Sequence, residues 1–440
     1  ADGGDAGGLH FGGAQGLTPD RLNRGGDDGG VLLHPARFRV GLGNLGVGPT
    51  LDAPFAVEDE GGDSGGPLVD GQDELAHGEE RPAAIKALSR RRVEPRVPLF
   101  AGKLLLRDAV VEGWLEAEGG RCVDWGDGAP PGQPDATGWI VPTPVNAHTH
   151  VFDAALRELP GKPRTVPELV GPGGWKHKGL AMSKPDQLKA GVVGYVAEME
   201  ACGVAAFLDF REGGVAGIEA LRSIEGLGPR PVVFGRPAKN TFDATEAAAI
   251  LAITDGIGLS ALRDFHNPSD VEAWAEAAHK ARKPFALHAS EAKREDWDAI
   301  LSLEPAFLVH GLQAAPSEWE DAAQQGVPLV VSPRSNSWYG LKTPVAGMLE
   351  AGLTVAVGTD NGMLHDGDIW AELGQLAAWF PRITTEELLR LATWNARPLA
   401  GLPAALPPRK GQVLDVVVLP ETPWKTVGTR KPGLDPIQLK

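Results

Sequence analysis

Short apolar runs and helical stretches alternate along the chain from about residue 142 to residue 396. Eight runs have the length and composition of buried strands, and they read WIVPTPV, GVAAFLDF, PVVFG, GIGLSAL, PFALHAS, AFLVHG, VPLVVSP and LTVAVGTD. A helical stretch follows each run, as in parallel sheets whose strands are connected by helices. This repeat is typical of a TIM-type (β/α)8 barrel, which we predict for residues 142–396. A doubly wound open sheet is the alternative, although no motif marks a nucleotide-binding switch point.

Two β-rich segments flank the barrel segment. Residues 93–141 contain short apolar runs separated by Gly, Asp and Glu, which is typical of antiparallel strands. A similar fragment, KGQVLDVVVLP, lies near the other end of the chain. We therefore predict that residues 93–141 and 397–430 form one small β-sandwich domain into which the barrel is inserted.

Residues 1–92 differ from the rest of the chain because they are rich in Gly, Asp and Glu and show little apolar periodicity. A segment of this composition buries too little apolar surface to offset its conformational entropy. We predict a disordered arm without an assigned function, and an interaction tail or an overlong gene prediction are the alternatives.

The charge of the chain restricts its partners. A net charge of -16 and a pI near 5.2 argue against nucleic acid and anionic membranes, which bind basic surfaces. Two cysteines, Cys122 and Cys202, fit a reducing compartment. No apolar run is long enough to span a bilayer and no signal sequence is visible. We predict a cytoplasmic protein with a small-molecule substrate, and a homodimer is compatible with these features.

The first apolar run ends in His148 and His150, within the sequence WIVPTPVNAHTHVFD. Residues two apart in a strand point to the same face, so the two imidazoles lie side by side. Neutral imidazole is the commonest metal ligand among side chains. Taken alone, however, the pair is equally well explained as two partly solvated polar residues at a strand end.

Further polar residues close later apolar runs. His288 ends the fifth run and Glu291 follows it, His310 ends the sixth run, and Asp360 ends the eighth. Each has an ordinary explanation as a polar cap or a turn residue. In a barrel, however, the carboxyl ends of all strands meet at one mouth. The whole set therefore predicts a metal site at that mouth.

These histidines and the aspartate, at these strand ends and in this order, resemble the amidohydrolase superfamily. The resemblance covers Val93 to Val418 and leaves out the first ninety residues. Glu291 and the sequence SPRSN resemble the branch that contains cytosine, guanine and adenosine-type deaminases and triazine hydrolases. The sequences DFREGG, ALHASE and GTDNGM are closest to archaeal-type members of that branch.

A hydrolytic metal site needs enough ligands to hold the ion and one open position for water. We predict that His148, His150, His288 and Asp360 hold one divalent ion, with Zn²⁺ as the first choice and Fe²⁺ as the alternative. A second ion in this superfamily needs a bridging lysine at the end of strand four, and the sequence has none there. Lys239, beyond strand three, is only a weak candidate for that role.

The remaining polar residues predict the course of the reaction. The ion would lower the pKa of its water from about 15.7 toward about 7, so that metal-bound hydroxide forms at neutral pH. Asp360 would accept the proton of that water, and His310 would orient the hydroxide. Glu291 is placed to protonate a ring nitrogen of the substrate, with Asp264 and His266 as the alternative proton carriers.

Several residues near strand ends are candidates for substrate contacts, namely Arg211, Arg236, Arg334, Asn336 and Trp175. Arginine forks suit carboxylates and phosphates, but the same residues could equally form ion pairs within the protein. The Gly- and Pro-rich segment 168–180 is either a lid over the site or a surface loop.

Together these features predict an aminohydrolase that releases ammonia from a small cyclic amidine, such as an aminated pyrimidine or purine. A hydrolase of cyclic amides with the same metal site is the first alternative. A metal-binding barrel without catalysis is the second.

Residues 1–92 are expected to be dispensable because their composition lacks a core. A chain that starts at Val93 should fold, bind metal and keep its activity, as measured by circular dichroism, metal content and turnover. Insolubility or inactivity of this shorter chain would contradict the prediction, because the arm would then pack against the barrel or complete an oligomer.

Overall fold

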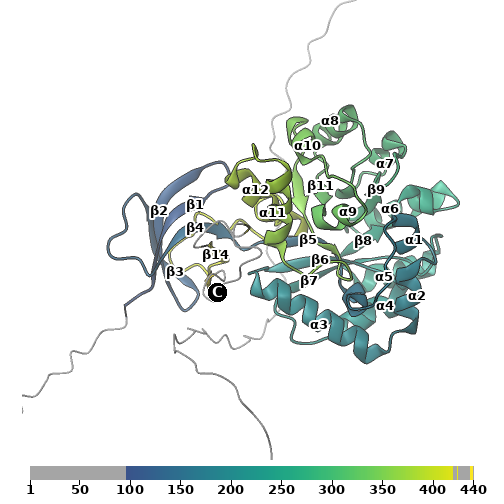
Figure 1. Ribbon diagram of the computed structural model, residues 1–440, viewed down its shortest axis with the longest axis horizontal. Helices are drawn as coiled ribbons and strands as arrows, with labels where there is room; N and C mark the ends of the chain where they lie inside the picture. The colour runs from purple at the N-terminus through teal and green to yellow at the C-terminus, as the bar shows by residue number, and fades with distance from the viewer. Residues whose placement is uncertain (1–95, 420–423, 425–436, 440) are drawn as a thin grey trace, which may run out of the picture. The chain divides into compact units, whose positions relative to one another are not determined.

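The computed structural model describes residues 96–419, 424 and 437–439, which contain two β-sheets and the helices shown in Figure 1. The predicted arm, residues 1–92, lies outside the described residues.

The smaller sheet is built from both sides of the barrel segment. Its strand order is β15-β14-β4-β1-β2-β3. The strands are β1 (Leu99–Leu105), β2 (Val110–Glu118), β3 (Arg121–Asp127), β4 (Ala136–Pro142), β14 (Val416–Leu419) and β15 (Ile437–Leu439). β4 pairs with β14 in antiparallel orientation and with β1 in parallel orientation. The predicted sandwich is not confirmed, because the described strands of this part form one sheet, and β15 lies beyond residue 430.

The larger sheet is parallel throughout and has the order β12-β11-β10-β9-β8-β7-β6-β5-β13. Its strands are β5 (Val145–His150), β6 (Ala206–Arg211), β7 (Arg230–Gly235), β8 (Gly256–Leu259), β9 (Phe285–Ala289), β10 (Phe307–His310), β11 (Leu329–Val331), β12 (Val355–Val357) and β13 (Asp360–Asn361). Only Gly358 and Thr359 separate β12 from β13. The eighth apolar run therefore pairs with β11 through β12 and with β5 through β13. This curled sheet fits the predicted (β/α)8 barrel.

Glycine at position 358 allows this arrangement. A Cβ atom added to Gly358 would lie 2.5 Å from the backbone nitrogen of His148 and 2.6 Å from its carbonyl oxygen. These distances are too short for any side chain, so only glycine permits strand eight to approach strand one so closely.

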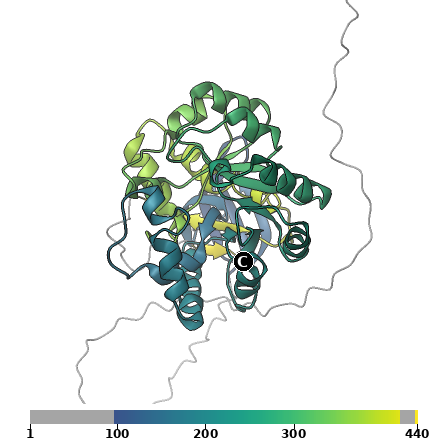
Figure 2. The ribbon, with the colours of Figure 1, turned by 90° about the vertical axis from the view of Figure 1, so that its right-hand side faces the viewer.

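The helices lie around the larger sheet, as Figure 2 shows. Those that follow the apolar runs are α3 (Pro185–Ala201), α4 (Gly214–Arg222), α5 (Ala244–Ile253), α6 (Pro268–Lys280), α7 (Trp297–Ser302), α8 (Pro316–Gln324), α10 (Val345–Glu350), α11 (Ile369–Trp379) and α12 (Thr385–Ala392). Side-chain caps fix where some of them begin: the Asp243 carboxylate accepts a hydrogen bond from the Glu246 amide at the start of α5. Within the described part of the chain, no helix is both long and apolar enough to cross a membrane.

Short helical segments occupy connections in which no helix was predicted. They are the α-helices α1 (Val166–Leu169), α2 (Trp175–Met182) and α9 (Pro333–Trp338), and the 3₁₀ helices η1 (Val151–Leu156), η2 (Leu262–Asp264) and η3 (Pro398–Ala400). α1 and α2 fall in and beside the segment for which a lid or a surface loop was expected.

Aromatic rings fill the interior of the larger sheet beneath the first histidine. The Phe210 ring packs against His148 with 4.6 Å between centroids, and against Phe234 with 5.5 Å. Phe307 contacts Phe234 at 5.2 Å. All three phenylalanines are buried, which gives the histidine cluster a rigid apolar floor.

A buried arginine connects the two sheets. Arg397, which follows α12 and is 1% exposed, donates to the Thr143 hydroxyl at 2.7 Å and to the Asp415 carboxylate. Thr143 lies between β4 and β5, and its hydroxyl donates to Asp415 at 2.6 Å. Because Asp415 directly precedes β14, this network joins the end of the barrel segment to the junction between the sheets.

Replacing Arg397 by Ala is expected to destabilise the protein by about 2–4 kcal/mol, since the partly buried Asp415 carboxylate and the Thr143 groups lose their partner. The measurement is the denaturant midpoint of unfolding. The exposed Arg382 is a matched control, and its replacement by Ala should change stability by less than about 0.5 kcal/mol. Equal midpoints for the two variants would contradict a structural role for Arg397.

Candidate metal centre and active site

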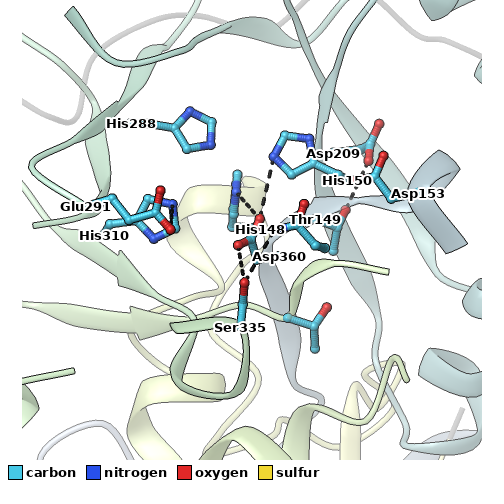
Figure 3. Close-up of polar contacts among 12 residues, drawn as sticks. His148, Thr149, His150, Asp153, Asp209, His288, Glu291, His310, Ser335 and Asp360 are labelled. Carbon is cyan, nitrogen blue, oxygen red and sulfur yellow. Dashed lines mark hydrogen bonds and ion pairs between the residues drawn. The ribbon is translucent and has the colours of Figure 1, made fainter. Parts of the chain in front are cut away.

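The predicted metal ligands converge at the carboxyl ends of the strands of the larger sheet. His148 and His150 belong to β5, His288 to β9, and Asp360 begins β13. His310 ends β10 beside them. All five side chains are buried, and Figure 3 shows them pointing toward one another.

Asp360 lies at the centre of this cluster. Its Oδ1 is 3.3 Å from His148 Nε2 and 3.6 Å from His150 Nε2. A tetrahedral ion with bonds of about 2.0–2.1 Å separates neighbouring ligand atoms by about 3.3–3.4 Å. Three overlapping groups of residues have ligand atoms within 4.8 Å of one another: His148 with His288 and His310, His148 with His150 and Asp360, and Asp360 with Glu291 and His310.

The chemistry of these donors fits a metal ion. Both ring nitrogens of His148 are buried; among the described residues Nδ1 has no hydrogen-bond partner, and Nε2 faces the Asp360 carboxylate. Burial lowers the pKa of His148, His150 and His288, which favours the neutral imidazole that binds a metal. Three imidazoles and one carboxylate are a donor set suited to Zn²⁺.

Hydrogen bonds from outside the cluster orient two of the predicted ligands. His288 Nδ1 lies 2.8 Å from the Leu259 carbonyl oxygen, and it must carry the proton because a carbonyl only accepts. The lone pair of His288 therefore lies on Nε2. Ser335 donates to Asp360 Oδ2 at 2.6 Å, which leaves Oδ1 facing the histidines (Figure 3).

The backbone is strained where these side chains are presented. His310, Asp360 and Ser290 have φ values of +77°, +58° and +45°, in the left-handed region that disfavours residues with a Cβ atom. Such residues cost about 1–3 kcal/mol each and concentrate at functional sites. The surrounding packing must hold these residues in their strained conformations, which is typical of a functional site.

Glu291 faces the cluster from the loop after β9. Its Oε1 lies 3.8 Å from His310 Nε2, and the residue is 8% exposed. Burial, together with the nearby Asp360 charge, raises the pKa of Glu291 to about 8. Burial lowers the pKa of His310 to about 4. The carboxyl group is thus protonated and the imidazole neutral near pH 7.

A cavity of about 200 Å³ opens above the cluster. His150, His288, His310, Glu291 and Asp360 contribute to its lining. An apolar part of the lining comes from segment 166–172, which includes α1. The predicted lid segment therefore begins in a wall of the cavity, while its role as a moving lid stays a prediction.

A buried charged group forms the polar side of the cavity. Lys176 Nζ lies 2.8 Å from Glu212 Oε1 and 3.4 Å from Asp153 Oδ2, and Arg236 donates to the same Glu212 oxygen at 2.8 Å. Although burial opposes it, the charges of Lys176 and Arg236 hold the pKa of Glu212 below its usual range. Of this group, only Arg236 was predicted as a substrate contact. No sequence signal identified Lys176, which lies on the short helix α2.

The other predicted substrate contacts do not line the cavity. Arg211 donates to the Glu212 carbonyl oxygen, and Arg334 pairs with Glu372 at 2.7 Å. Asn336, on α9, accepts a hydrogen bond from the Thr343 hydroxyl, and Trp175 packs in an apolar cluster beside α1. For the two arginines this placement favours ion pairs and hydrogen bonds within the protein.

A family model described as the amidohydrolase family matches residues 139–405. The chain belongs to the amidohydrolase family. The predicted resemblance to the superfamily and the predicted hydrolase class are thereby confirmed.

Relatives of this amidohydrolase are found in archaea. A provisionally named aminohydrolase of Archaeoglobus fulgidus is 36% identical over 235 residues, which cover 53% of this chain and 67% of the relative. A 5-methylthioadenosine/S-adenosylhomocysteine deaminase of Halobacterium salinarum is 26% identical over 305 residues, covering 60% of this chain and 68% of the relative.

A solved structure shares the fold of this amidohydrolase. An adenosine deaminase from Xanthomonas campestris with bound zinc superposes with a TM-score of 0.58 and 18% identity, covering 77% of this chain and 87% of the other. At this identity the likeness concerns the fold alone.

Replacing His148 or Asp360 by Ala should abolish metal binding, because each removes a donor from the same cluster. Elemental analysis of the unaltered protein should find about one divalent ion per chain, as expected for a four-ligand site without a bridging lysine. Lys239 is exposed and does not line the cavity, so its replacement by Ala is the control and should leave the metal content unchanged. Two ions per chain, or metal loss on changing Lys239, would contradict the single-ion site.

Proposed function

We propose that this amidohydrolase is an aminohydrolase with one metal ion, which releases ammonia from a small cyclic amidine such as an aminated pyrimidine or purine. One observation carries the proposal: the buried Glu291 carboxyl lines the same cavity as His150, His288 and Asp360, which together with His148 make up the cluster of predicted ligands. A ring carbon bonded to an amino group and a ring nitrogen becomes electrophilic when that nitrogen is protonated. The site therefore pairs a proton donor with a metal centre.

His148, His150, His288 and Asp360 would hold the ion, and zinc would supply the Lewis acidity that activates a water molecule at neutral pH. Asp360 Oδ1 faces the histidines while Oδ2 is occupied by Ser335. Oδ1 is thus the oxygen that would accept the proton of the attacking water. His310, neutral at pH 7, would orient the water and stabilise the charge that develops at the attacked carbon.

Glu291 would give its proton to the ring nitrogen. Its raised pKa, about 8, keeps the carboxyl protonated at neutral pH, and its position on the cavity wall allows contact with a bound ring. A new bond then forms between the ring carbon and the water oxygen. The proton held by Asp360 passes to the amino group, the carbon–nitrogen bond breaks and ammonia leaves. The remaining hydroxyl proton passes to the Glu291 carboxylate as the carbonyl group forms, which restores the protonated Glu291.

The cavity supports a small substrate, and the relatives support the release of ammonia. A space of about 200 Å³ is smaller than the pockets of about 300–1,000 Å³ that hold drug-sized ligands. The relatives named an aminohydrolase and a 5-methylthioadenosine/S-adenosylhomocysteine deaminase agree with release of ammonia. The apolar wall of segment 166–172 would pack against the face of a planar ring.

Replacing Glu291 by Gln keeps the size of the side chain but removes the transferable proton. We expect kcat to fall by about 10²–10⁴-fold, while metal content and fold stability stay near those of the unaltered protein. The assay is ammonia release from a panel of aminated heterocycles, with elemental analysis of each protein. Glu320 is exposed on α8, and its replacement by Gln is the matched control.

Loss of metal together with activity would place Glu291 among the ligands. Near-normal turnover would assign the proton to another group, and Asp264 also lines the cavity. If the protein hydrolysed cyclic amides but released no ammonia from any aminated heterocycle, the proposal would be replaced by its first alternative, a hydrolase of cyclic amides with the same metal site.

A further inference from the structure

A β-bulge interrupts the strand that carries two of the predicted ligands. β5 pairs with β6 at Asn146↔Phe207 and again at Thr149↔Asp209. Between these pairs β5 advances by three residues and β6 by two, so β5 has one extra residue, and His148 lies in this bulge. A bulge re-aims side chains but leaves the extra residue without its strand hydrogen bonds. The position of the two histidines therefore depends on contacts other than regular strand pairing.

Asp209, on β6, supplies such a contact. Its Oδ1 accepts a hydrogen bond from the Val151 amide at 2.8 Å. The Thr149 hydroxyl shares its single proton between this Oδ1, at 3.2 Å, and the Leu208 carbonyl oxygen, at 3.0 Å. Thr149 and Val151 flank His150 in the chain, so one oxygen atom holds the residues on both sides of that ligand (Figure 3).

The same part of β5 determines the distance to the ligand on strand eight. Thr149, which pairs with Asp209 on one side, pairs with Asp360 of β13 on the other. His150 Nε2 lies 3.6 Å from Asp360 Oδ1. A movement of Thr149 would change this distance, and an ion is bound tightly only when its donor atoms lie at the separations that its bond lengths impose.

The second oxygen of Asp209 indicates that the residue does more than stabilise the fold. Asp209 is 0% exposed, and its Oδ2 has no hydrogen-bond partner in the part of the chain that the structure describes. The nearest printed cation, Arg211 Nη1, is 3.9 Å away from Oδ2. A buried oxygen without a partner lowers stability. Asp209 does not line the cavity, so we infer that it acts through the backbone that its Oδ1 holds.

We propose that Asp209 is a positioning residue of the metal centre, and that its Oδ1 directs His150 toward the ion by holding Thr149 and Val151. The inference rests on the metal centre of the proposed function, but it does not depend on the substrate. It requires an acceptor oxygen and no charge, because an amide N–H needs only an acceptor. Asparagine should therefore substitute for Asp209, whereas alanine should not.

The test measures how tightly the zinc-loaded full chain holds its ion, by titration with a chelator of known affinity. Asp209→Ala removes the acceptor, and the zinc dissociation constant should rise by about 10- to 100-fold, as for other residues that orient metal ligands. The visible absorption of Co²⁺-loaded protein reports the arrangement of the ligands, and it should change as well. In Asp209→Asn the dissociation constant should stay within about threefold and the spectrum should be retained.

Two controls separate positioning of the ligand from general stability. Asp255 precedes β8, at the amino ends of the strands, and its Oδ2 accepts a hydrogen bond from the Val233 amide at 2.8 Å. Asp255→Ala thus removes the same kind of contact at the opposite end of the strands, and it should leave zinc affinity unchanged. Arg397→Ala, which is expected to lower stability, should also bind zinc as the unaltered protein does.

Unchanged zinc affinity and an unchanged Co²⁺ spectrum in Asp209→Ala would overturn the inference. Equal losses in Asp209→Ala and Asp209→Asn would also overturn it, since the charge of Asp209 would then matter instead of its acceptor oxygen. If Asp209→Ala does not fold, Thr149→Val is decisive, because it keeps the shape but lacks the hydroxyl. Its zinc affinity should fall by about 3- to 10-fold, and an unchanged affinity would contradict the inference.

Ammonia release by the unaltered chain separates this inference from the proposed function. Weaker zinc binding in Asp209→Ala, without ammonia release from any aminated heterocycle by the unaltered chain, would leave the role of Asp209 standing and remove the aminohydrolase proposal. Ammonia release together with unchanged zinc binding in Asp209→Ala would do the reverse. An unaltered chain that binds no zinc would overturn both.

Discussion

The contact between the first and the eighth strand of the larger sheet is the constraint on which the site depends. β13 pairs with β5, and Gly358 lets the two backbones approach where no side chain would fit. This pairing brings Asp360 Oδ1 to 3.3 Å from His148 Nε2 and 3.6 Å from His150 Nε2. Residues more than two hundred positions apart in the chain thereby share one centre. The phenylalanine floor beneath His148 and the serine behind Asp360 hold the two halves of that centre in place.

Burial then determines the protonation of the groups around the centre. Loss of hydration favours uncharged imidazoles in the histidines and an uncharged carboxyl in Glu291, since each charged form would lose contact with water. Asp360 is the exception. Burial opposes its charge, but contacts with His148 and His310 and the Ser335 hydrogen bond keep its pKa below the usual range. Two carboxyl groups in one cavity therefore differ in charge, as the proposed roles of Asp360 as proton acceptor and Glu291 as proton donor require.

The strands and the members of the histidine–aspartate cluster were largely predictable because both depend on local sequence. Apolar runs bounded by Gly and Pro indicated the strands of the larger sheet, and the residues that close those runs indicated the cluster. The small domain was predicted less well: its strands were found, but the arrangement of those strands in one sheet depends on pairings between β1, β4 and β14. Such pairings join distant parts of the chain, and a pattern within one strand does not encode its neighbours.

By itself, the sequence determined the alternation of strands and helices, the acidic character of the protein and the strand-end positions of His148, His150, His288, His310 and Asp360. Tertiary structure decided what the remaining polar residues contact. An arginine fork suits a substrate anion as well as a protein carboxylate. Only the proximity of Glu372 in the fold shows that Arg334 pairs with a protein carboxylate. Lys176 and Glu212 lie 36 positions apart, so no local pattern connects them.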